Sequence, residues 1–515
     1  MKFRRAEFTL FLLSILCFAC PAQPAATSPI TKPLVVSSNF RYFKDSHGAA
    51  IVLNGSQTWN TFQDWGSDGS ASALDFDTFV RFLTAHGHNF TLLWRVEQPK
   101  FCNLPVNTGE SPEFTVSPQP WLRTGPGRAS DGGLKFDLTK FNQVYFQRLR
   151  ARTQALNIAG IYAGIYLFTG EFLNLYRCAT DGYPFTGTNN INGVDDGYRS
   201  GPQGNGSIEM TSPNEITRFQ DAFVDKVIDT LNDLPNVLWI VSEEAPPGSL
   251  WWNHHLIAYV RSYEAGKPYQ HPIGFASPIG VPDSVIYDSE ADWVAPAAKI
   301  SPTSSCGAGK PTCKVNVNDS DHSYWEMWLH TSQENRNYIW ENVLNGNSVL
   351  FMDPYLVYYP RQNRNLCLSP LHGICTSPDP RYENFRNNLG YALKYARKLD
   401  LAKATPQGIL TSTGYCLAEI SPAGAKYLVY APSGGGFEVD LSAVSRSRTL
   451  AVEWFNPATG AVIAGKPVRA GSRTESFAPP FSGDAVLLLV ERTGVVTSIT
   501  AVRSDTDRQY SKSHE

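Results

Sequence analysis

Residues 212–246 read SPNEITRFQDAFVDKVIDTLNDLPNVLWIVSEEAP, and this stretch decides the fold. A serine–proline pair opens it, and the apolar residues of 214–234 then recur with the spacing of an amphipathic helix. Residues 237–242 form a short apolar run with the length and composition of a buried strand. This run ends directly on Glu243 and Glu244. The stretch therefore predicts one helix–strand unit of a parallel sheet, with two carboxylates at the end of the strand.

The same alternation of short apolar runs and helical segments extends across residues 51–398. The predicted strands are residues 51–54, 89–94, 160–168, 237–242, 272–276, 292–296, 314–319 and 348–352. The predicted helices are residues 75–86, 138–156, 214–234, 250–265 and 331–344. Eight strands alternating with helices predict an α/β fold, a closed (β/α)₈ TIM barrel. A doubly wound open sheet is the alternative, but no glycine-rich phosphate loop follows the first strand.

The chain is expected to divide into four parts. Residues 1–26 have a basic start, an apolar run and small residues, and predict a signal peptide. Residues 35–402 form the predicted barrel. Short alternating runs separated by glycine- and proline-rich turns predict a small antiparallel β-sandwich over residues 405–493. Residues 494–515 are polar and are expected to be a disordered tail.

The export signal predicts a secreted or periplasmic protein, and no second hydrophobic span follows that could cross a membrane. Lipid attachment at Cys20, which follows the small Ala19, is an alternative, although the large Phe18 makes it weaker. The other cysteines agree with an oxidising compartment. Their spacing suggests Cys306–Cys313 and Cys367–Cys375 as local disulfides and Cys102–Cys178 as a third pair, which leaves Cys416 odd.

Composition excludes some partners. The chain of 515 residues is 42% hydrophobic and 18% charged with a formal net charge of −3, which gives no footprint for nucleic acid or an anionic membrane. It also carries 12 Trp, 23 Tyr and 28 Phe. These residues fill large cores, but Trp and Tyr are also flat, amphipathic surfaces for sugar rings.

The carboxyl ends of barrel strands face the mouth, where reactive side chains lie. The fourth predicted strand ends on Glu243 and Glu244, and the seventh ends on Asp319, Asp321 and His322. Glycoside cleavage needs two carboxyl groups on either side of one bond, and strands four and seven face each other across a barrel. Acids at strand ends also cap helices or solvate loops, but two acidic clusters on opposed strands favour catalysis.

Further strand ends supply candidate sugar contacts. The expected substrate-binding residues are Trp59, Trp94, Arg95, Glu97, Glu171, Glu243 and His322. Arg95 is predicted either to hold a carboxylate ionised, or to bind an anionic sugar, or to form a structural ion pair with Glu97. No metal site and no cofactor are predicted, because the adjacent His254 and His255 make no ligand pattern. A Ser-His-Asp hydrolase would need a G-x-S-x-G elbow, and none is present.

Several longer motifs resemble a known family. Residues 41–64, RYFKDSHGAAIVLNGSQTWNTFQD, together with 135–138, 145–150, 237–244 and 318–322, resemble secreted proteins classed as glycosidases. The broader similarity is to clan A retaining glycosidases and apiosidase-like barrels. The segments WFNPATG at 454–460 and FAPP at 477–480 resemble a sandwich described as collagen-binding in relatives.

This resemblance implies roles for individual residues. In clan A enzymes strand four ends in Asn-Glu, so Glu243 falls on the asparagine position and Glu244 on the acid/base. Asp319 aligns with the strand-seven nucleophile, whereas its neighbour His322 favours Asp321. Aspartate is shorter than the usual glutamate, which leaves an inverting course open beside the retaining one.

Two functions follow as hypotheses. The first is a glycoside hydrolase acting on a poly- or oligosaccharide with two carboxylates, with the retaining course expected. The second is a non-catalytic carbohydrate- or matrix-binding protein on the same scaffold, since the asparagine is missing. The expected partner is a carbohydrate and not a nucleic acid, and the oligomeric state stays open.

Overall fold

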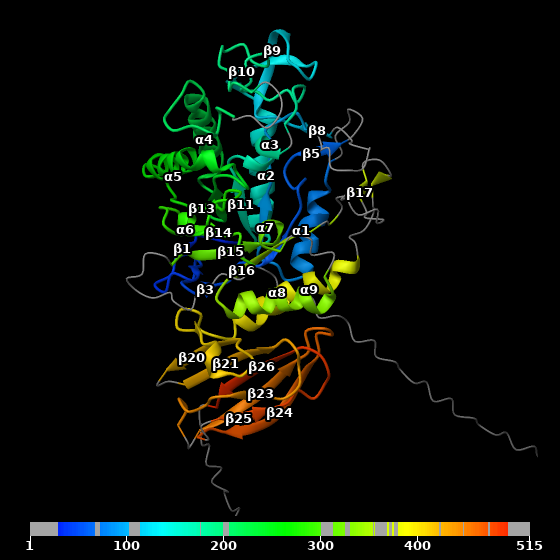
Figure 1. Ribbon diagram of the computed structural model, residues 1–515, viewed down its shortest axis with the longest axis vertical. Helices are drawn as coiled ribbons and strands as arrows, with labels where there is room; N and C mark the ends of the chain where they lie inside the picture. The colour runs from blue at the N-terminus through cyan, green and yellow to red at the C-terminus, as the bar shows by residue number, and fades with distance from the viewer. Residues whose placement is uncertain are drawn as a thin grey trace, which may run out of the picture.

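The computed structural model describes residues 29–66, 73–101, 114–175, 177–198, 205–299, 313–324, 330–353, 355, 368–369, 373–374, 380–421, 424–445, 448–471 and 474–492. The predicted signal peptide and tail lie outside this range. Figure 1 shows a larger part of strands and helices above a smaller part made of strands.

Eight parallel strands form the barrel, as predicted. In chain order they are β4 (Gly55–Gln57), β6 (Phe90–Leu93), β11 (Tyr162–Tyr166), β12 (Val237–Ile240), β13 (Ile273–Ala276), β14 (Trp293–Ala295), β15 (Val315–Asp319) and β16 (Ser348–Met352). Hydrogen bonds join them in the order β4-β16-β15-β14-β13-β12-β11-β6. The barrel closes between its first two strands, where the Asn89 amide donates to the Asn54 carbonyl (3.0 Å) and Thr91 Oγ1 to the Ser56 carbonyl (2.8 Å).

The first barrel strand begins later than predicted. Residues 51–54 were expected to form it, but β3 (Ala50–Ile51) instead pairs with β2 (Phe43–Lys44), which pairs with β1 (Val35–Val36). The barrel strand starts at Gly55, where a Cβ atom would lie 1.8 Å from the Phe90 carbonyl oxygen. Only glycine allows the backbones to approach so closely, and this sets where β4 enters the barrel.

Helices surround the barrel. The long ones are α1 (Phe76–Ala85), α2 (Gln143–Ile158), α4 (Thr217–Leu231), α5 (Leu250–Glu264), α8 (Ser332–Leu344) and α9 (Glu383–Ala396), and the short ones are α3 (Gly170–Leu175), α6 (Ser284–Tyr287) and α7 (Ser320–Ser323). Asp75 caps α1 by accepting the Thr78 amide (3.0 Å), and Thr331 and Glu334 form a capping box on α8. Helix α2 starts later than predicted, because β10 (Leu134–Phe141) occupies the first part of that segment.

Alternate residues of each strand face opposite sides of the barrel wall. On β6 and the residue after it, Phe90, Leu92 and Trp94 belong to the interior core, whereas Leu93 packs against the helices. Trp293 also fills the interior, and a Cβ at Gly274 would lie 2.1 Å from its ring. The interior is therefore a packed core, and ligands must bind at its mouth.

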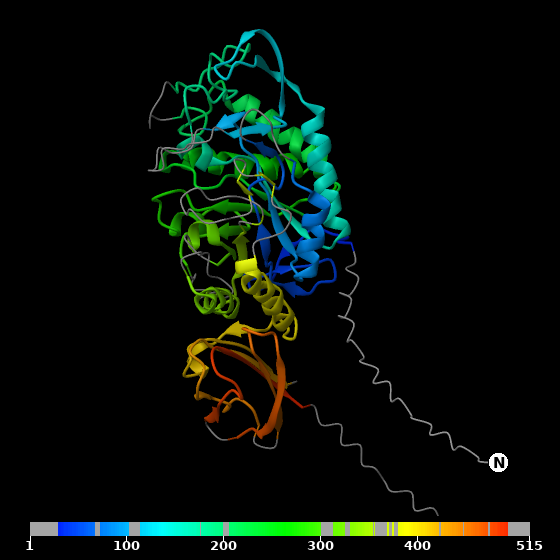
Figure 2. The ribbon, with the colours of Figure 1, turned by 90° about the vertical axis from the view of Figure 1, so that its right-hand side faces the viewer.

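Extra elements follow the first barrel strands and so lie on the mouth side. These are a sheet of β5 (Asp64–Gly66), β7 (Lys100–Phe101) and β8 (Phe114–Ser117), and a hairpin of β9 (Trp121–Arg128) and β10. Figures 1 and 2 show the hairpin at the end of the molecule far from the C-terminal strands.

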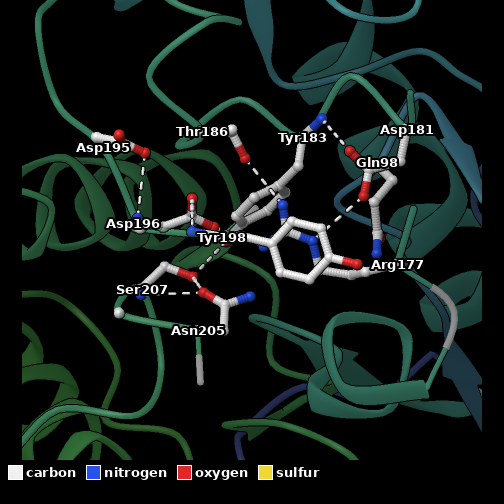
Figure 3. Close-up of polar contacts among 12 residues, drawn as sticks. Gln98, Arg177, Asp181, Tyr183, Thr186, Asp195, Asp196, Tyr198, Asn205 and Ser207 are labelled. Atoms are coloured by element: carbon white, nitrogen blue, oxygen red, sulfur yellow. Dashed lines mark hydrogen bonds and ion pairs between the residues drawn. The ribbon is translucent and has the colours of Figure 1, made fainter. Parts of the chain in front are cut away.

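The segment after α3 is organised by one buried arginine, shown in Figure 3. The Arg177 side chain bonds to Asp181 (3.2 Å), Asp196 (2.5 Å) and Thr186 Oγ1 (2.8 Å). Its guanidinium also lies 4.5 Å from the Tyr183 ring centre and 3.7 Å from that of Tyr198. We call these six residues the Arg177 network; they hold a long loop in place without regular secondary structure.

The C-terminal part is the predicted antiparallel sandwich. Its six-stranded sheet has the order β19-β20-β21-β26-β23-β24, and a second sheet pairs β22 with β25. The strands are β19 (Thr405–Pro406), β20 (Cys416–Ser421), β21 (Gly424–Ala431), β22 (Phe437–Val439), β23 (Thr449–Phe455), β24 (Val462–Arg469), β25 (Glu475–Phe477) and β26 (Ala485–Glu491). A core of alternating strand residues, Val429, Phe437 and Leu487 among them, lies between the two sheets.

The six-stranded sheet packs on helices α8 and α9, which lie between barrel and sandwich in Figures 1 and 2. Trp340 of α8 stacks on Tyr430 (ring centres 6.0 Å apart) and contacts Phe455 (5.9 Å). Beside them Arg336 forms a two-pronged ion pair with Asp484 (2.8 and 2.6 Å). One continuous apolar core thus joins the two parts, so the sandwich supports the barrel from the side of these helices.

Only some of the cysteines lie within the described range. Cys178 and Cys313 are each disulfide-bonded, but their predicted partners Cys102 and Cys306 lie outside the described range, as do Cys367 and Cys375. Cys416 is a buried free thiol, and burial raises its pKa to about 12.

Within the described ranges, no helix is long and apolar enough to span a bilayer.

Candidate active site

The acidic end of the fourth strand is held by the loop that follows the third. The Glu171 amide donates to the Glu243 carbonyl (2.8 Å), and the Ile279 amide donates to the Ala245 carbonyl (3.0 Å). A Cβ at Gly170 would lie 2.4 Å from the Ala245 Cα atom. The absence of a side chain at residue 170 therefore lets the two loops pack directly and fixes Glu171 beside Glu243 and Glu244.

Two adjacent glutamates occupy different environments. Glu243 is fully buried, whereas Glu244 is half-buried and has a φ of +40°. Left-handed backbone at a residue other than glycine costs on the order of 1–3 kcal/mol and is concentrated at functional sites. The turn at Glu244 thus separates the two side chains and leaves the second one nearer to solvent.

A chain of polar and aromatic contacts crosses the mouth from strand one to strand four. Gln57 Oε1 accepts from Trp94 Nε1 (2.5 Å), and Trp94 packs on Tyr166 (ring centres 4.7 Å apart). The Tyr166 hydroxyl in turn donates to Glu243 Oε2. Gln57 Nε2 is buried and has no hydrogen-bond partner within the described part of the chain. It is thus a donor that a ligand hydroxyl could satisfy.

The seventh strand brings two aspartates to the same place. Asp319 ends β15 and caps α7 by accepting the Asp321 amide on its Oδ1 atom (3.0 Å). Asp321 is only 4% exposed, and its Oδ2 atom finds no hydrogen-bond partner among the residues that the structure describes. The side chain of His322 lies outside that description.

The causes of the pKa shifts at two buried groups indicate which acids of strands three, four and seven lie near one another. Burial raises the pKa of Asp321 well above its usual range, and the negative charges of Glu171, Glu244, Asp319 and Glu243 raise it further. Burial also raises the pKa of Tyr166, with further contributions from Glu243, Asp319 and Asp321. We call Glu171, Glu243, Glu244, Asp319 and Asp321 the carboxylate cluster.

Two predicted sugar contacts lie elsewhere. Arg95 follows the inward-facing Trp94 and therefore points to the helix layer. There its Nη1 donates to the Leu167 carbonyl (2.6 Å), and its guanidinium lies 4.3 Å from the ring centre of Phe223 on α4. The expectation that Arg95 meets the catalytic carboxylates or an anionic sugar does not agree with this placement.

Glu97 lies on the same side as Arg95. Its carboxylate accepts from the Thr169 amide and hydroxyl, both at 2.5 Å. Burial raises the pKa of Glu97, and the charge of Arg95 opposes that rise. Thr169 therefore holds the Glu97 carboxylate, and the structural ion pair between Arg95 and Glu97 stays a prediction.

Aromatic side chains border the cluster. Trp94 is fully buried in the barrel interior, but Trp59 is half-buried. Trp59 stacks on Trp65 (ring centres 6.0 Å apart, planes within 16°), and Trp65 meets Phe172 edge to face (5.8 Å). Phe172 directly follows Glu171, so this row of aromatic rings begins beside that acid. The half-buried Trp59 ring at its other end is a partly exposed apolar surface at the mouth.

No three His, Cys, Asp or Glu residues within the described ranges are arranged to hold an ion.

Sequence reasoning missed Tyr166 and left Gln57 as a strand-end residue without a role. Both occupy inward positions at strand ends, which is the signal that could have identified them.

Comparison with known proteins agrees with the architecture. A model of a domain of unknown function (DUF6298) matches residues 114–300, and one described as "Putative collagen-binding domain of a collagenase" matches residues 411–490. None of the curated proteins matches the chain.

Solved structures give the fold. One described as a glycoside hydrolase has a TM-score of 0.57 at 13% identity, covering 90% of this chain and 98% of its own. A glycoside hydrolase family 5 protein from Bacteroides vulgatus has a TM-score of 0.58 at 14% identity, covering 89% of this chain and 92% of its own. At such low identity these likenesses show the fold alone: the chain shares its fold with these two solved structures over most of its length.

Proposed function

We propose that the protein is a glycoside hydrolase that cleaves O-glycosidic bonds of a poly- or oligosaccharide at the carboxylate cluster. The observation that carries this proposal is the convergence of Glu244 and Asp319 with Asp321, whose own carboxyl is buried among them. Hydrolysis of a glycoside needs one carboxyl that donates a proton and another that is ionised. A cluster of acids that raises the pKa of one member favours a protonated carboxyl beside an ionised one.

In this proposal Glu244 is the general acid/base. It is the more exposed of the two strand-four glutamates and can reach a bound glycosidic oxygen. Asp319 is the ionised partner, since its Oδ1 atom accepts a backbone amide and that contact favours the charged form. Asp321 carries a proton and offers a hydrogen bond. Trp59 is the platform on which a sugar ring stacks.

The same proposal assigns supporting roles. Tyr166 orients Glu243 through the hydrogen bond between them, and Glu243 takes the place that asparagine holds in the clan A pattern. The retaining course is expected, with Asp319 as nucleophile. Proton NMR of the first product decides this point, because a retaining enzyme releases the anomer of the substrate and an inverting one releases the opposite anomer.

The test is release of reducing ends from plant, microbial and animal glycans, comparing wild type with Glu244→Gln. Turnover is expected to fall about 10³-fold or more in the variant, while the melting temperature and glycan binding stay close to wild type. Turnover that survives in Glu244→Gln removes this residue from the mechanism.

Glu243 in the asparagine position favours one other function. A barrel that binds sugar without cleaving it would release no reducing ends from any glycan and would still bind one. That combination of results would replace the hydrolase with a carbohydrate-binding protein.

A further inference from the structure

The sign of the electrostatic field at the mouth restricts which sugars can bind there. Asp321 is acted on by the negative charges of Glu171, Glu244, Asp319 and Glu243. Tyr166, on another strand, is acted on by Glu243, Asp319 and Asp321. Among the residues that the structure describes, the charged groups with the largest effects at both buried positions are therefore carboxylates.

The arginine nearest in sequence does not offset this field. Arg95 follows an inward-facing strand position, yet its guanidinium donates to the Leu167 carbonyl and packs over Phe168 and Phe223. These contacts keep the positive charge in the helix layer, behind the barrel wall. An anionic sugar at the mouth would thus meet acids and not Arg95.

Two buried polar atoms indicate what a ligand must offer. Asp321 Oδ2 and Gln57 Nε2 are both buried and lack hydrogen-bond partners in the residues described here. A protonated Asp321 and the Gln57 amide are donors, and they suit the lone pairs of sugar hydroxyl and ring oxygens. Neither interaction needs a charge on the sugar.

We infer that this site selects against anionic sugars and takes a glycan whose bound ring is uncharged or positively charged. The inference rests on the proposed function, because it places the sugar ring against the carboxylate cluster. Two like charges about 7 Å apart at an effective dielectric constant of about 20 weaken binding by tenfold or more, and salt reduces the effect.

The experiment uses pairs of tetrasaccharides that share a linkage and differ only at C6. Galactose, glucose and mannose tetramers are compared with the matching uronate tetramers and with the methyl esters of those uronates. Binding to the full-length protein is measured by calorimetry at low and high salt, and hydrolysis by reducing-end release. The neutral and methyl-ester forms are expected to bind at least about tenfold more tightly than the uronate, with a smaller difference at high salt.

Glu171→Gln tests whether the cluster causes this difference. It removes one charge from the mouth, and the discrimination between neutral and uronate forms is expected to shrink severalfold. Glu215→Gln removes the same charge from an exposed position and is expected to leave the discrimination unchanged. If Glu171→Gln does not fold, the salt dependence of the wild-type difference decides.

The experiment distinguishes failure of this inference from failure of the proposed function. A uronate that binds as tightly as its methyl ester, or a difference that neither salt nor Glu171→Gln alters, overturns this inference. If neutral glycans are then still hydrolysed, the proposed function stands. Binding to none of the tetramers, together with no hydrolysis, counts against both.

Discussion

Buried acids gather in two places on the mouth side of the barrel, and the two groups differ in how their charge is balanced. In the Arg177 network, Asp181 and Asp196 lie on either side of one guanidinium, with tyrosine rings on its faces (Figure 3). In the carboxylate cluster, Asp321 faces four other acids. Burial would lower the pKa of Arg177, but Asp181 and Asp196 outweigh it and raise that pKa, whereas in the cluster burial and neighbouring charges both raise the pKa of Asp321.

This difference in charge balance indicates different roles for the two groups. A buried ion pair with satisfied hydrogen bonds holds a loop in one conformation, and its loss is costly. Buried carboxylates that repel one another contribute no such order. They are kept where a reaction needs a proton on one group and a charge on the next. The two groups should therefore respond in opposite ways when a charge is removed.

The largest expected change in stability is in the Arg177 network, where the buried charges are balanced. Arg177→Met removes the cation and leaves Asp181 and Asp196 buried without it. The free energy of unfolding is expected to fall by about 3–5 kcal/mol, because uncompensated buried charges are left behind. Calorimetry and urea denaturation measure the loss. Arg81→Met on the exposed face of α1 is the control and should change stability by less than about 0.5 kcal/mol. Equal effects of the two substitutions would contradict a structural role for Arg177.

Replacing one aspartate by asparagine in each group tests the comparison directly. Asp196→Asn weakens the contact with Arg177 and is expected to cost about 2 kcal/mol of stability at pH 7. Asp321→Asn removes a repelled carboxyl and is expected to raise stability by about 1 kcal/mol while abolishing most turnover. Urea denaturation of both variants at one pH checks the signs. A loss of stability in Asp321→Asn as large as that in Asp196→Asn would show that the cluster, too, is structural.

The pH dependence of Asp321→Asn has a definite sign. The pKa of Asp321 is raised in the folded protein, and in the unfolded chain it is about 3.9. Below the unfolded pKa both states are protonated, so the variant should match wild type. As the pH rises from about 4, the unfolded chain ionises first and wild type loses stability until the folded pKa is passed. The advantage of the variant should therefore grow with pH across that window. A constant difference at all pH values would mean that Asp321 is not held protonated.

The sequence predicted the barrel well because period-two and period-3.6 patterns are local properties. The rule that acids at strand ends meet at the mouth also brought Glu244, Asp319 and Asp321 together. The same alternation, applied one residue further, would have placed Arg95 outside, since Phe90, Leu92 and Trp94 all face the interior. Side chains at one strand end alternate between the interior and the helix layer, so they do not all face a ligand.

Other features could not be read from the sequence because they depend on distant contacts. Arg177 meets Asp196 nineteen residues away across a loop with no periodic pattern. The hydrogen bond from Tyr166 to Glu243 joins two strands, and nothing local marks the tyrosine. The start of β4 depends on how closely Gly55 approaches the Phe90 carbonyl. The docking of the sandwich likewise depends on the contact of Trp340 with Tyr430 and Phe455.

The smallest expected effect contrasts the aromatic residues of the two regions. Trp59 is half-buried beside the cluster, whereas Tyr183 is fully buried against Arg177 and bonds to Ser207 (2.9 Å). Trp59→Ala should raise KM about tenfold with kcat nearly unchanged, because it removes a stacking surface that ground state and transition state use alike. Tyr183→Phe should cost about 1 kcal/mol of stability through the lost hydrogen bond and leave KM unchanged. Steady-state kinetics on any glycan that the wild type cleaves, with melting curves of both variants, make the measurement. If Trp59→Ala lowered stability and not affinity, the half-exposed ring would belong to the core, and the sugar would have to be held by the hydrogen bonds of the mouth alone.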